Sequence, residues 1–186
     1  KYSSSLIDNY RYKLFNNSIK NNIKLKILHV TNFNVRHNGR LFYNTGRRIN
    51  NGFLKLGHTV QTLSDRDTIS QERKMFDIYG SKSLNQKLLD LVGNFTPNLI
   101  VIGHADQISL DTLYLIKKFY PSICISQWFL DKMDEKAWLN NKKRFIKKFD
   151  CIDSSFCTTH PTSLNFKTYN NIFFIPNPVD ETFENL

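Results

Sequence analysis

Hydrophobic residues along this chain fall into two alternating patterns, short continuous runs and longer stretches with helical spacing. The run KLKILHVTNF, residues 24–33, is typical of a strand that is buried on both faces of a sheet. A polar segment with one glycine follows at 34–40, and apolar residues then recur at helical spacing in 41–56, which predicts a helix. Gly57 suits the left-handed conformation that ends a helix, and 58–64 predicts a second strand.

The same alternation of strands and helices continues to the end of the chain. It predicts further helices at 83–92, 110–120 and 135–149, and further strands at 98–103, 122–127, 151–158 and 171–175. Pro176 and Pro178 end the pattern, because proline cannot donate a hydrogen bond to a sheet ladder. The alternation predicts an α/β fold, with a Rossmann-like parallel sheet flanked by helices.

The pattern divides the chain into a lead-in or linker segment at 1–22, a Rossmann-like domain at 23–176 and the start of an interdomain linker at 177–186. In such a domain the loops after the strands lie along one edge of the sheet, where a ligand crevice forms. We expect these loops at 34–40, 65–67, 104–106, 128–134 and 159–161. We therefore expect the functional residues in these loops.

Composition sets broad limits on the function. With 186 residues, 40% of them hydrophobic, the chain can fill a substantial core. The formal net charge of +10 favours an acidic partner such as nucleotide phosphates, an anionic lipid surface or nucleic acid, and a coding bias toward Lys, Asn and Ile explains it equally well. Neither a long apolar stretch nor a signal peptide is visible, so we expect a cytoplasmic protein.

Four segments of the chain are similar to segments of a known family and follow one another in the same order. They are NNGFLKLGHTVQTLS, TPNLIVIGHAD, FDCIDSSFCTT and FFIPNPVDETF. They resemble, in turn, the first helix with the second strand, the fourth strand with its loop, a later strand, and the segment entering the interdomain linker of GT-B glycosyltransferases (glycosyltransferase family 4/1-like). In the last segment Pro178 stands where that family usually has glycine.

The resemblance implies that the chain is the amino-terminal half of a two-domain enzyme. Such an enzyme transfers a sugar from a nucleotide-sugar donor to a hydroxyl of a sugar or lipid-linked acceptor, and no cofactor is expected. The second domain of the family supplies most of the donor contacts, so this half would provide the acceptor side and be inactive alone.

The loop after the first strand is a candidate contact for the donor phosphates. Asn38, Gly39 and Arg40 lie there, ahead of a helix whose free N–H groups and dipole favour anions. By the resemblance they would meet the phosphates across the interdomain cleft. An ordinary strand-to-helix turn with one glycine is the alternative, because the glycines of a dinucleotide-binding motif are missing.

His104 and Asp106 directly follow an apolar strand, so their side chains are expected in the crevice. A histidine with a near-neutral pKa can position a sugar hydroxyl or accept its proton, and a nearby carboxylate would fix its tautomer. Alternatively, His104 caps the next helix or binds backbone groups.

Trp128 and Asp131 are candidates in the next loop, QWFLDKMDE. An aromatic face suits a sugar ring and a carboxylate suits its hydroxyls, and Asp131 is a candidate base for an inverting transfer. In the alternative interpretation Trp128 belongs to the core and the acidic residues cap the following helix.

The basic segment KKRFIKK, 142–148, is typical of a solvated helix face, and a peripheral contact with the inner face of a membrane is the alternative. We do not expect nucleic-acid binding, because no recognised binding module accompanies the charge. Cys151, Cys157 and His160 lack a fourth ligand at regular spacing, so no metal site is expected and the cysteines are interpreted as free thiols.

A second class of function remains open, a non-catalytic α/β module of flavodoxin-like or receiver-like type that binds a ligand or a partner protein. A receiver domain needs paired acidic residues after its first strand. This chain has Asn32 and Asn34 there.

Overall fold

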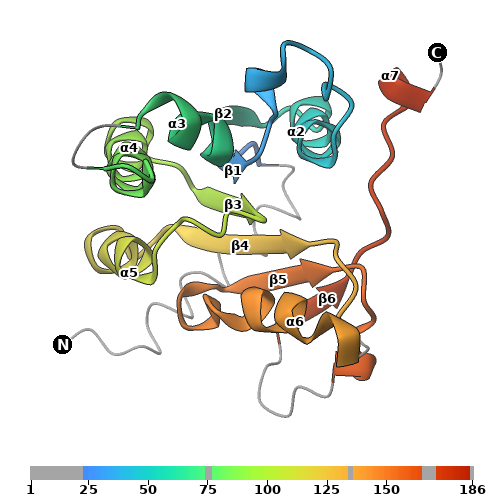
Figure 1. Cartoon of the computed structure of the whole chain (residues 1–186). Coiled ribbons are helices and arrows are strands. Elements are labelled where there is room, and N and C mark those ends of the chain that lie inside the picture. Colours follow the sequence, from blue (N-terminus) through green and yellow to red (C-terminus); the bar gives the residue numbers. More distant parts are fainter. Residues whose placement is uncertain (1–22, 74–76, 134–135, 165–170, 185–186) are drawn as a thin grey trace.

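A computed structural model of the protein describes residues 23–73, 77–133, 136–164 and 171–184. They form a six-stranded sheet in the order β2-β1-β3-β4-β5-β6, and every neighbouring pair is parallel (Figure 1). The strands are β1 (Lys26–Thr31), β2 (Thr59–Ser64), β3 (Leu99–Gly103), β4 (Cys124–Phe129), β5 (Ser154–Cys157) and β6 (Ile172–Phe174). The predicted α/β fold with a parallel sheet flanked by helices is confirmed, and the lead-in segment 1–22 lies outside the described residues.

Helical segments connect these strands. The α-helices are α2 (Thr45–Lys55), α3 (Asp65–Gln71), α4 (Ser81–Phe95), α5 (Leu110–Phe119), α6 (Leu139–Ile146) and α7 (Glu181–Glu184). The 3-10 turns are η1 (Val35–His37), η2 (Lys136–Trp138), η3 (Phe149–Cys151) and η4 (Pro161–Leu164). Gly57 follows α2 with a φ of 79°, as predicted for a residue that ends a helix.

Several sequence predictions of element boundaries were wrong, and two of these concern the loops where functional residues were expected. The helix predicted from Leu41 begins only at Thr45, because Asn44 caps it by accepting a hydrogen bond from the backbone N–H of Arg47 at 3.1 Å. The segment 65–67, predicted as a loop, is the first turn of α3. Its acidic residues favour a helix start through the helix dipole, but the segment is too short and polar to show a helical pattern.

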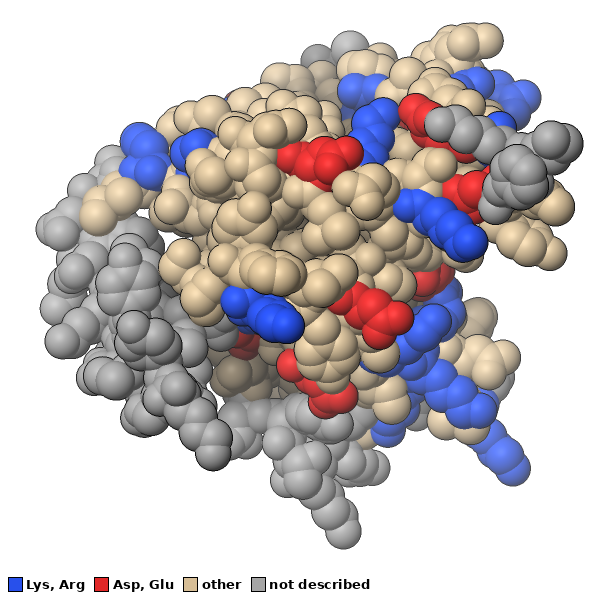
Figure 2. Space-filling model, turned by 90° about the vertical axis from the view of Figure 1, so that its left-hand side faces the viewer, with Lys and Arg blue, Asp and Glu red and all other residues tan. Residues whose placement is uncertain are grey.

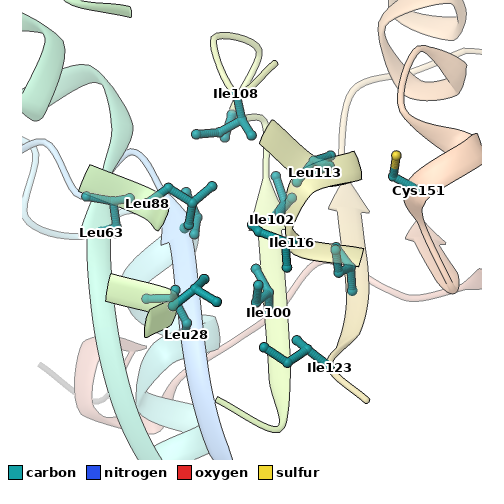
Figure 3. Packing of buried hydrophobic residues seen from close by; sticks show 14 of the residues in the cluster. Leu28, Leu63, Leu88, Ile100, Ile102, Ile108, Leu113, Ile116, Ile123 and Cys151 are labelled. Carbon is teal, nitrogen blue, oxygen red and sulfur yellow. The ribbon is translucent and has the colours of Figure 1, made fainter. Parts of the chain in front are cut away.

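The core lies on both faces of the sheet, because successive strand residues point to opposite sides. On one face Leu28 and Ile100 of the strands pack with Leu88 of α4 and Ile116 of α5, and Figure 3 shows side chains from strands and helices meeting in this cluster. On the other face, Val101 packs with residues of α2. Helices α3, α4, α5 and α6 therefore cover one face, and α2 lies on the other.

The segment after β6 returns to α2, and Figure 1 shows α7 beside that helix. Asp180 is buried there, and its carboxylate accepts hydrogen bonds from Asn51 Nδ2 at 2.7 Å and Lys55 Nζ at 2.9 Å. Thr182 completes the contact by donating its backbone N–H to the same carboxylate at 3.0 Å. The described part of the predicted linker, 177–184, is thus fastened to the domain.

None of the helices among the described residues is long and apolar enough to cross a membrane.

Candidate functional site

The carboxyl ends of β1, β3 and β4 meet at one edge of the sheet, since the strands are parallel. The chain leaves β1 toward β2 on one side, whereas β3 lies on the other side of β1. This reversal is the topological switch point at which α/β sheets bind ligands. The first residues after β3 and β4 are therefore the place to look for a site.

His104 directly follows β3 in the left-handed conformation, with a φ of 48° that is uncommon for a residue with a large side chain. Its ring stacks on Phe129 with centroids 4.4 Å apart, and its Nε2 accepts a hydrogen bond from the backbone N–H of Leu130 at 3.2 Å. Because Nε2 is an acceptor, the proton of the neutral ring is assigned to Nδ1. Burial lowers the pKa of His104, which favours this neutral form.

Asp131 faces the protonated nitrogen of His104. The distance from His104 Nδ1 to Asp131 Oδ2 is 3.7 Å, longer than a direct hydrogen bond. The Asp131 side chain is 45% exposed, whereas that of His104 is 20% exposed, so a ligand can reach the space between them.

Arg144 of α6 links the two predicted acidic residues. Its Nη2 and Nε donate to the two carboxylate oxygens of Asp106, at 2.7 and 3.3 Å, and its Nη1 lies 3.4 Å from Asp131 Oδ2. The guanidinium also lies over the ring of Phe129, 5.3 Å from its centroid. Arg144 therefore contacts both carboxylates and fixes their orientation.

Lys148 and Asp65 are two further titratable residues that are buried in this part of the domain. Lys148 donates a hydrogen bond from Nζ to the carbonyl oxygen of Ala105, and it interacts electrostatically with Asp65 and Asp106. Burial lowers the pKa of Lys148 to about 8 and raises the pKa of Asp65 to about 6. Within the described residues, Asp65 Oδ1 is buried without a hydrogen-bond partner.

Sequence reasoning missed Arg144, Lys148 and Asp65. Arg144 and Lys148 lie within the segment 142–148, where the run of positive charges suggested a solvated face. Their spacing of four positions would place both side chains on one side of a helix, but α6 ends at Ile146 and Lys148 lies in the turn after it. Asp65 fell in a predicted loop, and its burial could not be read from the sequence.

The predicted phosphate contacts lie elsewhere on this edge. Asn38, Gly39 and Arg40 are exposed in the turn after η1, and in the described part of the chain no contact joins them to His104 or Asp131. Since α2 starts only at Thr45, its free N–H groups do not adjoin these three residues. The glycine at the start of α2 is Gly46, where an added Cβ would lie 2.7 Å from Thr31 Cγ2.

Backbone donors do follow β1, but a carboxylate of the protein occupies them. Asp67 accepts hydrogen bonds from the backbone N–H groups of Val35 at 2.8 Å and Arg36 at 3.1 Å. It also pairs with the Arg36 guanidinium at 2.8 Å and with the hydroxyl of Ser64. These groups hold the loop after β1 against α3.

Trp128 lies within β4 rather than in the following loop, and only 6% of it is exposed. Its indole covers Gly103 and donates from Nε1 to His29 Nε2 at 3.3 Å, in the core on the α2 side of the sheet. This position matches the alternative that placed Trp128 in the core. Sequence reasoning also missed His29, which is fully buried in β1, and its burial lowers its pKa to about 4.

The described residues contain no group of three or more His, Cys, Asp or Glu side chains placed to hold a metal ion. Cys151 and Cys157 are free and buried, and His160 is exposed. Burial raises the pKa of Cys157 to about 11, so its thiol stays protonated at neutral pH.

The surface carries both signs of charge. Over much of the face in Figure 2, Lys and Arg side chains are interspersed with Asp and Glu.

Comparison of the chain with protein-family models and with curated proteins finds no match. The geometry of the His104 site and the motifs of the sequence are therefore the basis for a functional proposal.

Proposed function

We propose that this domain holds the hydroxyl acceptor in a sugar transfer, as the amino-terminal domain of a glycosyltransferase that uses a nucleotide-sugar donor. The observation that carries the proposal is the pairing of His104 Nδ1 with Asp131 Oδ2, 3.7 Å apart at an accessible place on the carboxyl edge of the sheet. The order of the GT-B-like segments in the sequence supports it.

One hydroxyl group that lies beside the His104 and Asp131 pair can contact both side chains. That hydroxyl would accept a hydrogen bond from Nδ1–H of His104 and donate its own proton toward Asp131 Oδ2. As the hydroxyl oxygen bonds to the anomeric carbon of the donor, its proton passes to Asp131, and the nucleotide leaves with the electrons of the broken glycosidic bond. Asp131 is the general base in this scheme, and His104 positions the acceptor.

Arg144 supports the role of Asp131 as a base. Its Nη1 lies 3.4 Å from Asp131 Oδ2 and orients that carboxylate, whereas its shorter contact, at 2.7 Å, is with Asp106. The result is a carboxylate that is both oriented and reachable from solvent.

The acceptor in this proposal is a sugar or a lipid-linked sugar. A peripheral contact with the inner face of a membrane is compatible with the start of α6, where Trp138 and Leu139 are 44% and 50% exposed near the exposed Lys143. The donor would be bound mainly by a second domain.

One observation favours a second candidate, a non-catalytic ligand-binding module. The order β2-β1-β3-β4-β5 is that of flavodoxin-like domains, which bind ligands at the same switch point without group transfer. In that function the His104 and Asp131 pair would bind a polar ligand and leave it unchanged.

A transfer assay distinguishes the two. Protein expressed from the complete reading frame is incubated with a panel of nucleotide-sugars and hydroxyl acceptors, and products are identified by mass spectrometry. We expect transfer, reduced about 10²- to 10⁴-fold by Asp131→Asn because a general base is lost. Asp111→Asn, at an exposed position of α5, is the matched control and should retain full activity.

Wild-type activity in Asp131→Asn would contradict the role of Asp131 as the base. Saturable sugar binding, without transfer from any donor in the panel, would favour the binding module.

A further inference from the structure

The turn at His104–Asp106 is held in an unfavourable conformation. His104 has a positive φ, and the next residues form a tight turn in which the backbone N–H of Asp106 donates to the carbonyl of His104 at 2.9 Å. A non-glycine residue in this conformation is strained, and it persists only where its surroundings hold it in place. The contacts that hold this turn therefore decide where the His104 ring lies.

Lys148 provides such a contact from below the turn. Its ammonium donates to the carbonyl oxygen of Ala105, the residue between His104 and Asp106, and only 6% of Lys148 is exposed. The carbonyl of Ala105 also accepts the backbone N–H of Ile108 at 3.2 Å, so Lys148 binds the oxygen on which the next turn, 105–108, closes.

The burial of this charge is not explained by packing. An ammonium group is stable away from water only when charges and hydrogen bonds compensate its lost hydration. Asp65 and Asp106 supply attraction to Lys148, while Lys147 and Arg144 oppose it. Asp65 is itself only 1% exposed, so a carboxyl group is buried in addition to the ammonium group of Lys148.

We propose that Lys148 is a positioning residue, which holds the His104–Asp106 turn through the carbonyl oxygen of Ala105 and so keeps Nδ1 of His104 directed at Asp131. The contribution to catalysis rests on the proposed function, whereas the effect on the His104 ring does not. The two can therefore be tested separately.

The test uses the ¹⁵N signals of the histidine rings, which report tautomer and pKa. In the wild-type protein we expect His104 as the Nδ1–H tautomer. In Lys148→Met the turn loses its donor, so the ring should lose this tautomer preference and its pKa should rise toward the ordinary value of about 6.5. The largest charge effects on His104 come from Asp131, Arg144, Asp106 and Arg66, and all four groups remain in the variant.

Two controls separate this effect from general unfolding. Lys147→Met removes an exposed neighbouring charge and should leave the His104 signals unchanged. His29 lies in the core on the opposite face of the sheet, so its unchanged signals show that the fold is intact. If Lys148→Met does not fold, the double variant Asp65→Asn/Lys148→Met removes both buried charges and provides the same readout.

Wild-type His104 signals in either folded variant would overturn the proposal. In the complete enzyme we expect Lys148→Met to lower kcat up to about 10²-fold with little change in KM, because a displaced catalytic group slows the reaction at bound substrate. Altered His104 signals in a protein that transfers no sugar would uphold the positioning role and contradict the proposed function.

Discussion

Trp128 occupies the space that any side chain at position 103 would need, because an added Cβ at Gly103 would overlap the indole ring. The indole in turn donates a hydrogen bond to His29 in β1. Because Gly103 of β3 has no side chain, the indole of Trp128 in β4 can lie over β3 and reach His29 in β1.

We expect Gly103→Ala to destabilise the protein by about 1–3 kcal/mol, because the buried indole must move or β3 must shift. Urea unfolding measures the change. Gly52→Ala is the matched control, since an added Cβ there meets nothing within 4 Å in the middle of α2. It should stabilise the protein by roughly 0.5–1 kcal/mol, and equal effects of the two substitutions would contradict the packing argument.

His29 should make stability fall as the pH falls from about 6.5 to about 4. Burial lowers its pKa from 6.5 to about 4, so in this window the unfolded chain binds a proton that the folded protein does not. The shift corresponds to about 3 kcal/mol, fully present above pH 6.5.

The measurement is the free energy of unfolding of wild type and His29→Gln between pH 4 and 7.5. The difference between the two isolates His29 from the opposite trend of Asp65, whose raised pKa makes stability fall as the pH rises from about 4 to about 6. His160→Gln changes an exposed ring and should follow the wild-type curve.

Asp180 should control whether the segment 176–184 stays on α2. Hydrogen bonds from Lys55 and Asn51 lower the pKa of Asp180, so its contribution is complete above the ordinary pKa of about 4 and is lost at lower pH. We expect Asp180→Asn to increase amide hydrogen exchange in this segment at pH 6, and Glu181→Gln, whose side chain is 73% exposed, to change it little. Equal exchange in both variants would show that other contacts hold the segment.

Arg144→Met should raise the pKa of His104, because the guanidinium is one of the charges that lower it. It should also release Asp106 and Asp131 from their shared partner. Histidine ring NMR titration measures the pKa, with the exposed Lys143→Met as the control. A His104 pKa that stays constant in Arg144→Met would mean that burial alone sets it.

The parallel sheet could be predicted from the sequence because its strands are buried on both faces and read as continuous apolar runs, as in β1 and β3. The start of α2 at Thr45 was harder to predict from the sequence. Leu41 extends the helical spacing by one turn, although it is 44% exposed. The decisive signal was the cap at Asn44, a local contact that outweighs hydrophobic spacing.

The candidate site was only partly visible in the sequence. His104, Asp106 and Asp131 follow strands, so topology alone placed them on one edge. Arg144 comes from α6 and Lys148 from the turn that follows it, and their contacts with residues 38 and 43 positions earlier depend on how α6 packs on the sheet. Trp128 differed from its predicted position because β4 runs two residues further than its apolar pattern suggested.

The contact between Asn51 and Asp180 joins residues 129 positions apart. During synthesis α2 is made early. Its side chains can bind Asp180 only after the 129 positions between Asn51 and Asp180 have been added. Loop closure over such a distance is slow compared with local pairing, so the sheet should assemble first and this segment should dock last.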